Sequence, residues 1–307
     1  MNMTRKEINE LRDLPLAELM GLALKTKLAR RGDKFSLCSI INAKSGRCSE
    51  DCNFCAQSAH FKTDAPVYPL KDDAEIIAAA QEAKRIGAHR FSLVTSGRGL
   101  PAKEVGRLAN TIDAIRRQVD IHVCASLGIL DKTALRELRS AGMTRYHHNL
   151  ETSQEFFPKV VTTHTFKERL DTIRAAQDEG LEVCAGGIIG MGESEEDRIS
   201  MALTLQECQV NSVPLNILIP LPGTPLAHQT RISPPAILKT IALYRLIHQQ
   251  IPIRLAAGRE SALGELLSNA FMAGADGMMI GGYLTQRGRM PEDDIHFVRQ
   301  MQMVWTG

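Results

Sequence analysis

Three cysteines fall within eight residues of this 307-residue chain, at Cys48, Cys52 and Cys55. The residues before them, 43–47, lack a helical period and include Gly46, so we expect the cysteines in a loop that follows an apolar strand. A structural zinc site takes four protein ligands, and this motif offers three. A 4Fe–4S cluster usually takes four thiolates, so three leave one iron with an open position. The spacing therefore predicts an iron–sulfur cluster that can bind a small ligand.

Strand patterns and amphipathic helical patterns alternate along the rest of the chain. The strands are expected at 35–42, 90–95, 121–127, 145–151, 181–188, 213–219, 251–257 and 277–280, with helices near 72–86, 103–117, 133–141, 165–179, 195–208 and 236–249. This alternation predicts an α/β fold, a (β/α)8 barrel of the TIM type with an N-terminal helical cap. We expect residues 1–33 to form the helical extension, and residues 34–307 to form the barrel with a C-terminal helical segment.

The predicted strands carry apolar side chains on one face and polar side chains on the other, since alternate residues share a face. The apolar faces would meet the helices. The polar, inward set includes Cys38, Ser92, Cys124, His147, Asn149, Glu151, Cys184, Asn216 and Arg254. Buried polar groups without partners cost roughly 1–3 kcal/mol each. We therefore expect a polar ligand in a channel at the carboxyl ends of the strands, or alternatively a closed polar network that satisfies itself.

Three cysteines, Cys38, Cys124 and Cys184, take the inward face together with Arg254. A lone buried cysteine is most often a small hydrophobic residue. Three cysteines directed toward one lumen favour a second metal or cluster site. Cys208 lies near a helix end and is interpreted as structural.

Composition excludes several classes of protein. The net charge of +2 implies no general attraction to nucleic acid or to a membrane surface. No apolar run reaches the roughly 18 residues of a membrane span, and the N-terminus has no apolar signal core. Seven unevenly clustered cysteines do not resemble a secreted disulfide framework. These features predict a cytoplasmic protein in a reducing compartment.

The C-x3-C-x2-C spacing resembles the cluster motif of the radical S-adenosylmethionine (SAM) superfamily. Along nearly its whole length the chain also resembles the biotin synthase family. The matching stretches are CSEDCNFCAQS (48–58), YHHNLETS (146–153), TTHTFKERLD (162–171), VCAGGIIGMGE (183–193), VPLNILIPLPGTP (213–225) and IRLAAGRE (253–260). The cysteine motif alone indicates the superfamily, whereas HNLETS, the inner cysteines and the arginine of IRLAAGRE point to this family.

The resemblance implies that Cys48, Cys52 and Cys55 hold a 4Fe–4S cluster that binds SAM as cofactor. Cleavage of SAM would give a 5′-deoxyadenosyl radical, which abstracts hydrogen from unactivated carbons of dethiobiotin. An auxiliary iron–sulfur cluster would supply the sulfur of biotin, so the implied enzyme is a sulfurtransferase. The implied partners are a flavodoxin- or ferredoxin-type electron donor, the iron–sulfur assembly machinery and a second copy of the chain in a homodimer.

The resemblance also assigns ligand contacts. Asn149 and Asn216 would hydrogen-bond the ureido ring of dethiobiotin, because each amide offers a donor and an acceptor. Arg169 would pair with the SAM carboxylate through its guanidinium fork. The other cofactor contacts would come from Asn149, from Glu151 at the SAM ribose, and from Gly186, Ile188 and Glu193 near the adenosyl group.

The auxiliary site departs from the family pattern at one position. Well-known members hold a 2Fe–2S cluster with three cysteines and an arginine, and Cys124, Cys184 and Arg254 match three of these ligands. The remaining position is Ser92, whose oxygen is a poor substitute for a soft thiolate. We expect Cys38, on the neighbouring strand, to replace the missing ligand. A four-iron cluster on the three inner cysteines, with Arg254 released to hydrogen bonding, is the alternative.

Two other functions stay open at this point. A different radical SAM barrel enzyme, such as a hydrogenase-cofactor maturase or an amino-acid mutase, would need the lumen to bind an amino acid. An iron–sulfur carrier would need exposed clusters and no substrate channel, which the polar lumen argues against.

Overall fold

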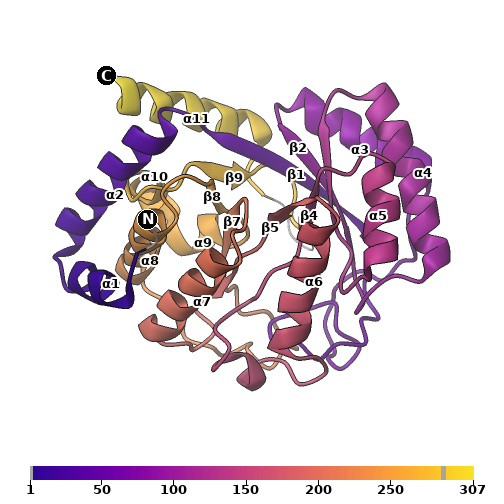
Figure 1. The fold of residues 1–307 in the computed structure, drawn as a ribbon, viewed down its shortest axis with the longest axis horizontal. Coiled ribbons are helices and arrows are strands. Elements are labelled where there is room, and N and C mark those ends of the chain that lie inside the picture. Colours follow the sequence, from indigo (N-terminus) through magenta and orange to yellow (C-terminus); the bar gives the residue numbers. More distant parts are fainter. Residues whose placement is uncertain (1–2, 285–287) are drawn as a thin grey trace.

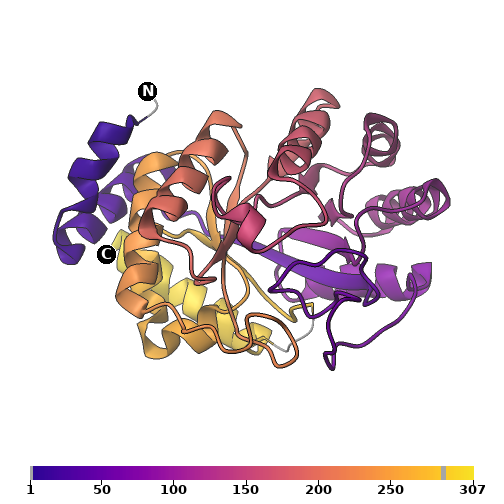
Figure 2. The ribbon, with the colours of Figure 1, turned by 90° about the horizontal axis from the view of Figure 1, so that it is seen from below.

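Parallel strands alternate with helices in the computed structural model, which describes residues 3–284 and 288–307. The strands are β1 (Ser36–Lys44), β2 (Arg90–Thr95), β3 (His122–Ser126), β4 (Arg145–His147), β5 (Glu182–Cys184), β6 (Gly187–Ile189), β7 (Val213–Ile217), β8 (Ile253–Leu255) and β9 (Gly277–Met279). The helices lie outside the strands (Figures 1 and 2). They are α1 (Arg5–Arg12), α2 (Leu16–Arg31), α3 (Asp73–Arg85), α4 (Ala102–Gln118), α5 (Lys132–Ser140), α6 (Phe166–Asp178), α7 (Glu195–Glu207), α8 (Pro234–Ile247), α9 (Arg259–Leu263), α10 (Leu267–Met272) and α11 (Pro291–Thr306), with 3₁₀ turns at Phe157–Lys159 and Gly264–Leu266.

One parallel sheet contains all these strands, in the order β5-β4-β3-β2-β1-β9-β8-β7-β6. Its two end strands are neighbours in sequence, because only Ala185 and Gly186 separate β5 from β6. β5 pairs with β4 and β6 pairs with β7, so both edges of the sheet are joined to the same segment. The sheet therefore curls round until its ends meet, which confirms the predicted barrel.

The fifth predicted strand, 181–188, is interrupted rather than continuous. The gap between β5 and β6 falls at Gly186, which lies opposite Pro214 of β7. Proline has no N–H to donate to a ladder, so the regular pairing lapses there. A Cβ added to Gly186 would lie 1.9 Å from the carbonyl oxygen of Pro214. The two backbones can approach this closely because Gly186 has no side chain.

Side-chain caps set the start of the helix nearest the cavity. Thr165 accepts a hydrogen bond from the backbone N–H of Glu168, and the Glu168 carboxylate accepts one from the N–H of Thr165. This capping box satisfies two otherwise free donors at the start of α6. It also fixes the position from which the side chain of Arg169, in the first turn of α6, projects.

The N-terminal helices pack on the outside of the barrel. α2 packs against α8, and Figure 1 shows α1 and α2 together at one edge of the molecule. Arg31 of α2 forms a 2.6 Å ion pair with the buried Asp276, which precedes β9. Lys27 lies over the ring of Trp305 in α11. The predicted N-terminal helical cap is confirmed, and a domain boundary at residue 33 stays a prediction.

No helix within residues 3–284 and 288–307 combines the length and the apolar character needed to cross a bilayer.

Candidate functional site

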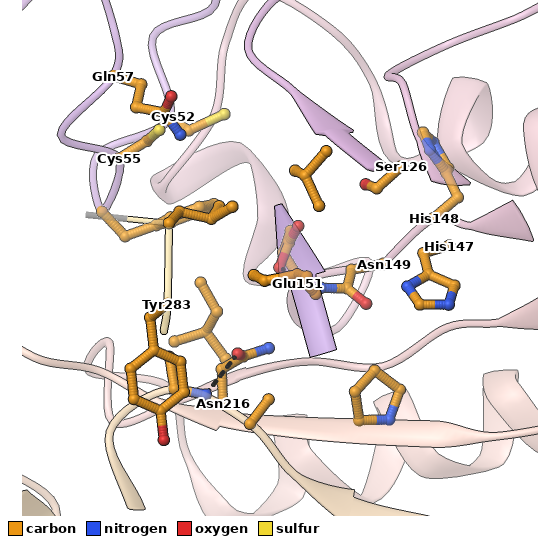
Figure 3. A pocket seen from close by; sticks show the side chains of 18 of the residues that line it. Cys52, Cys55, Gln57, Ser126, His147, His148, Asn149, Glu151, Asn216 and Tyr283 are labelled. Carbon is orange, nitrogen blue, oxygen red and sulfur yellow. Dashed lines mark hydrogen bonds between the residues drawn. The ribbon is translucent and has the colours of Figure 1, made fainter. Parts of the chain in front are cut away.

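A cavity of about 440 Å³ lies at the carboxyl ends of the barrel strands. The predicted site residues in its lining are Cys38, Cys48, Cys52, Cys55, Asn149, Glu151, Arg169, Cys184, Ile188, Asn216 and Arg254. Figure 3 shows Cys52 and Cys55 on one side of this cavity, His147 on the other side and Glu151 between them. The lumen is therefore open to a ligand rather than filled by its own polar network.

The cysteine loop is folded back on itself at one side of the cavity. The backbone N–H of Cys48 donates to the carbonyl of Gln57 at 3.0 Å, and the N–H of Ala59 donates to the carbonyl of Cys48 at 2.8 Å. The N–H of Cys55 donates to the carbonyl of Cys52 at 2.9 Å, which closes a tight turn between two of the thiols. Backbone bonds thus hold all three cysteines in one short loop, as the spacing predicts.

Asp51, which lies between Cys48 and Cys52, connects the loop to the segment before α6. Its carboxylate accepts hydrogen bonds from the backbone N–H groups of Thr162 and Thr163 at 2.9 and 3.2 Å. Partial burial raises the pKa of Asp51, but the bonds from Thr162 and Thr163 outweigh it and lower the pKa to about 2. The charged carboxylate therefore joins two segments that are more than a hundred residues apart.

Burial raises the pKa of two loop thiols. It raises the pKa of Cys52 although Arg169 is nearby, and it raises the pKa of Cys55 to about 11. A thiol binds metal as a thiolate, so loading this loop must release protons. Among the described residues, no three His, Cys, Asp or Glu side chains converge as the ligands of a single metal ion do. Thiolates of a cluster bind separate irons, so the donor set fits a cluster better than zinc.

Arg169 and Glu151 are adjacent residues of the cavity wall. Arg169 Nη1 donates to the backbone carbonyl of Asn149 at 2.8 Å and lies 3.6 Å from Glu151 Oε1. Glu151 has a φ of +68°, a left-handed conformation that costs roughly 1–2 kcal/mol for a residue with a side chain. Burial raises the pKa of Glu151, and Arg169 and Asn149 oppose that rise. Backbone strain of this kind clusters at ligand sites, so the position of Glu151 fits a cofactor contact.

The two asparagines of the cavity are held by backbone groups. Asn149 Oδ1 accepts from the N–H of Gly186 at 3.2 Å, and its Nδ2 lies 3.4 Å from the Glu151 carboxylate. Asn216 Oδ1 accepts from the N–H of Ala257 at 3.2 Å, and its Nδ2 donates to a carbonyl of β6 at 3.3 Å. A carboxamide can make four hydrogen bonds. Each asparagine therefore keeps one N–H and one lone pair for a ligand.

Part of the predicted adenosyl segment lies outside the cavity lining. Ile188 lines the cavity, whereas Gly186 and Glu193 do not. The Glu193 carboxylate accepts hydrogen bonds from the N–H groups of Gly190 and Met191 at 2.8 and 2.7 Å, so it shapes the turn after β6. Any effect of Glu193 on a cofactor would thus be indirect, because its carboxylate is occupied by its own loop.

The inner cysteines meet at the other end of the lumen. Cys38, Cys124 and Cys184 are all buried, as is Arg254. Burial raises the pKa of Cys38 and of Cys124, while the nearby Arg254 opposes both shifts. Arg254 Nη2 donates to the hydroxyl of Ser36 at 2.8 Å. The structure therefore brings together the cysteines that the alternation placed on one face, and one arm of the Arg254 guanidinium is occupied by Ser36.

Several polar atoms beside these thiols are buried without a hydrogen-bond partner among the described residues. They are Ser92 Oγ, Arg145 Nη1, His147 Nε2 and Arg254 Nε. Ser92 and Arg145 flank Cys124 in the sheet register, and His147 lies opposite Cys184. Unpaired buried polar atoms are rare, and each needs an explanation. An anionic group held by the thiolates at this place would supply the missing acceptors for the two arginines.

The sequence did not single out four residues of the site, which are Glu50, Arg145, His148 and His164. Arg145 lies two residues before His147 and shares its face of the strand, so extending the inward pattern by one step predicts it. Glu50 and His164 lie in two of the matching stretches but have no ligand spacing that would single them out. Strict alternation from His147 and Asn149 would turn His148 toward the helices, yet it lines the cavity, because β4 ends at His147 and the alternation ends with it.

Comparison with known proteins assigns the chain to a family. The Radical SAM superfamily matches residues 43–205, and the Biotin and Thiamin Synthesis associated domain matches residues 214–304. The chain is 51% identical over 283 residues to a biotin synthase from Heliobacterium modesticaldum, covering 92% of this chain and 87% of that protein. It is 50% identical over 296 residues to a biotin synthase from Geobacter sulfurreducens, covering 95% and 90%. The chain belongs to the biotin synthase family.

Solved structures that resemble this member of the biotin synthase family support its fold alone. Methylornithine synthase superposes with a TM-score of 0.85 at 21% identity, covering 98% of this chain and 93% of that one. The FeFe-hydrogenase maturase HydG from Carboxydothermus hydrogenoformans gives 0.83 at 18% identity, covering 97% and 75%. Both agree with the predicted (β/α)8 barrel.

Membership in the biotin synthase family also confirms the predicted cofactors, which are a 4Fe–4S cluster with SAM and an auxiliary iron–sulfur cluster.

Proposed function

We infer that this chain is a radical SAM sulfurtransferase that converts dethiobiotin to biotin. One observation carries the inference. A single cavity contains the thiols of the cysteine loop at one side, two carboxamides on its walls, and Cys38, Cys184 and Arg254 at its inner end. A substrate held by the carboxamides would thus lie between the two thiol groups. An iron–sulfur carrier needs no such enclosed space.

We propose that Cys48, Cys52 and Cys55 hold the SAM-binding cluster, and that Cys38, Cys124 and Cys184 hold the auxiliary cluster. When bound, the first cluster supplies the electron that splits SAM into methionine and a 5′-deoxyadenosyl radical, and the second supplies sulfide. Two C–H bonds of dethiobiotin are replaced by two C–S bonds, so each biotin requires two hydrogen abstractions and two molecules of SAM.

Arg169 and Glu151 are proposed to orient SAM. Among the described residues, Arg169 Nη2 has no hydrogen-bond partner, while its Nε and Nη1 are both engaged. Nη2 is therefore the arm left for the SAM carboxylate, and charge-assisted bonds of this kind are among the stronger ones in proteins. Glu151 supplies acceptor oxygens for the ribose hydroxyls from a conformation that the backbone holds under strain.

Asn149 and Asn216 are proposed to hold the ureido ring of dethiobiotin. A cyclic urea presents two N–H donors and one carbonyl acceptor, which match the free acceptors and donors of two carboxamides. Their backbone bonds keep both side chains in place before a ligand arrives, which lowers the entropic cost of binding.

At the inner end, Cys38 is proposed as the auxiliary ligand that replaces Ser92. Cys124, Cys184 and Arg254 are close enough to influence its pKa, which supports its membership of the ligand set. Arg254 is proposed to act as a hydrogen-bond donor rather than a ligand, because its Nη2 is already used by Ser36. Its Nε and the Nη1 of Arg145 then remain as donors toward an anionic cluster.

The electron donor, the cluster-assembly partner and the homodimer are also proposals. Cleavage of SAM needs an electron from outside the chain, which supports a flavodoxin- or ferredoxin-type donor, and loss of sulfide supports resupply by the iron–sulfur assembly machinery. All seven cysteines are free thiols, which supports the reducing environment of the cytoplasm. We retain a homodimer as a proposal from the family resemblance.

Product identity tests the proposed function. Anaerobically reconstituted protein, reduced with dithionite and given SAM and dethiobiotin, is expected to form biotin and 5′-deoxyadenosine, both quantified by mass spectrometry. Cys52→Ala should abolish both products because the SAM-binding cluster loses a ligand. Cys208→Ala is the matched control and should keep full yield, since Cys208 lies outside the cavity lining. Intact dethiobiotin alongside amino-acid-stimulated cleavage of SAM would instead indicate a different radical SAM enzyme.

A further inference from the structure

A chain of three hydrogen-bonded side chains connects the cysteine loop to α6. Glu50, between Cys48 and Cys52, has its Oε2 2.5 Å from Nδ1 of His164. The other ring nitrogen of His164, Nε2, is 3.1 Å from Nε of Arg169. Glu50 and His164 are each only 6% exposed, so water competes little for these bonds.

The donors and acceptors of Glu50, His164 and Arg169 permit a single arrangement of protons in these hydrogen bonds. A guanidinium has N–H donors and no acceptor, so His164 Nε2 must accept from Arg169. The proton of the neutral imidazole is therefore on Nδ1, which donates to the carboxylate of Glu50. The carboxylate thus fixes the tautomer of His164, and the tautomer presents a lone pair to Arg169.

The rest of the contacts hold each member of the chain in place. Glu50 also accepts from the hydroxyl of Thr163 at 2.8 Å and lies 3.4 Å from the guanidinium of Arg98. The ring of Phe157 packs edge-on against His164, with centroids 5.6 Å apart, and lies 5.7 Å from the guanidinium carbon of Arg169. The Arg169 fork is thereby set in one plane, with Nη2 as its remaining arm.

We propose that Glu50 and His164 are positioning residues that hold Arg169 in the orientation that binds the SAM carboxylate. This inference rests on the proposed function, because it presupposes that Arg169 meets SAM. A flexible arginine would have to be ordered on binding, whereas one already held by His164 has less freedom to lose. Since Glu50 belongs to the cysteine loop, the same contact places the carboxylate site at a fixed position relative to the cluster ligands.

The test measures SAM binding rather than turnover. Anaerobically reconstituted wild type, His164→Leu, His164→Gln and Arg169→Gln are titrated with SAM and with decarboxylated SAM by equilibrium dialysis. His248→Leu is the control, since His248 is similarly buried at 5% exposure and lies outside the cavity lining. Iron and sulfide content of each variant reports whether the clusters are still held, and thermal unfolding reports whether the chain is folded.

His164→Leu is expected to weaken SAM binding about ten- to a hundredfold, the effect of one lost hydrogen bond to a charged group. Its affinity for decarboxylated SAM and its iron content should match the wild type, because the carboxylate contact alone is lost. His164→Gln keeps an acceptor for Arg169 and should lose less, and His248→Leu should bind both ligands normally. Arg169→Gln combined with His164→Leu should bind SAM no worse than Arg169→Gln alone.

Equal losses for SAM and decarboxylated SAM, additive losses in the double variant, or unchanged SAM binding in His164→Leu would overturn the positioning role. If Arg169→Gln binds SAM like the wild type, the proposed carboxylate contact fails and this inference fails with it. If Arg169→Gln is weakened and His164→Leu is not, the proposed function stands and only the positioning role is wrong.

Discussion

Cys38 and Ser92 lie on neighbouring strands, but at different heights in the lumen, so they would place a cluster ligand differently. Ser92 lies opposite Ile40 in β1 and opposite Cys124 in β3, whereas Cys38 lies one inward-facing step earlier, opposite Arg90. The hydroxyl of Ser92 is buried and has no partner among the described residues. A ligand set that uses Cys38 therefore extends further toward the amino ends of the strands than one that uses position 92.

Mössbauer spectroscopy on iron-57-labelled protein tests the role of Cys38. With Cys48, Cys52 and Cys55 all changed to Ala, reconstituted protein should keep an iron–sulfur signal from the inner cysteines alone. Its isomer shifts would separate a two-iron from a four-iron cluster. Adding Cys38→Ala should abolish or strongly reduce this signal, because a thiolate is a far better iron ligand than the remaining oxygen donors. An unchanged spectrum would remove Cys38 from the ligand set.

At the scale of single residues, the sequence predicts only part of the site. The two-residue alternation of side chains along each strand was enough to place Cys38, Cys184 and Arg254 in one lumen, because it depends only on neighbouring residues. The alternation could not predict the contact between Glu50 and His164, since these residues are 114 apart in sequence and meet only through the fold. It also failed at His148, where the strand ends and the pattern no longer applies.

At the scale of elements, the segment that closes the barrel is the most constrained one. β5 and β6 together join the two edges of the sheet, and their junction at Gly186 meets the backbone of Pro214. Periodicity located this strand and the barrel helices to within a few residues, because those signals are regular. It could not predict the interruption, which depends on a proline in a strand that lies about thirty residues later in the sequence.

Gly186→Ala is expected to destabilise the protein by roughly 1–3 kcal/mol, because the added methyl overpacks against backbone. The new Cβ would lie 1.9 Å from the Pro214 carbonyl oxygen, so β7 or the closing segment has to move. Gly21→Ala in α2 is the control, because its new Cβ would have no neighbour within 4 Å. That change should be neutral or stabilise by up to about 1 kcal/mol. Thermal unfolding that ranks the two variants the other way would refute this account of the closure.

At the scale of the whole molecule, closing the sheet creates the space that the chemistry needs. The cysteine loop, the carboxamides and two of the inner cysteines line one cavity of about 440 Å³. Its volume is in the range of cavities that enclose small-molecule ligands. The proposed reaction requires a substrate between a radical source and a sulfur source, and a barrel with an open lumen can present both to one molecule.

The source of the sulfur tests this account most directly. Protein reconstituted with iron and ³⁴S-labelled sulfide, freed of unbound sulfide and then given SAM, reductant and dethiobiotin, is analysed for the mass of the product. We predict biotin that carries ³⁴S, because the sulfur comes from a cluster held in the barrel. Biotin without the label, or no biotin from protein that contains both clusters, would contradict the account.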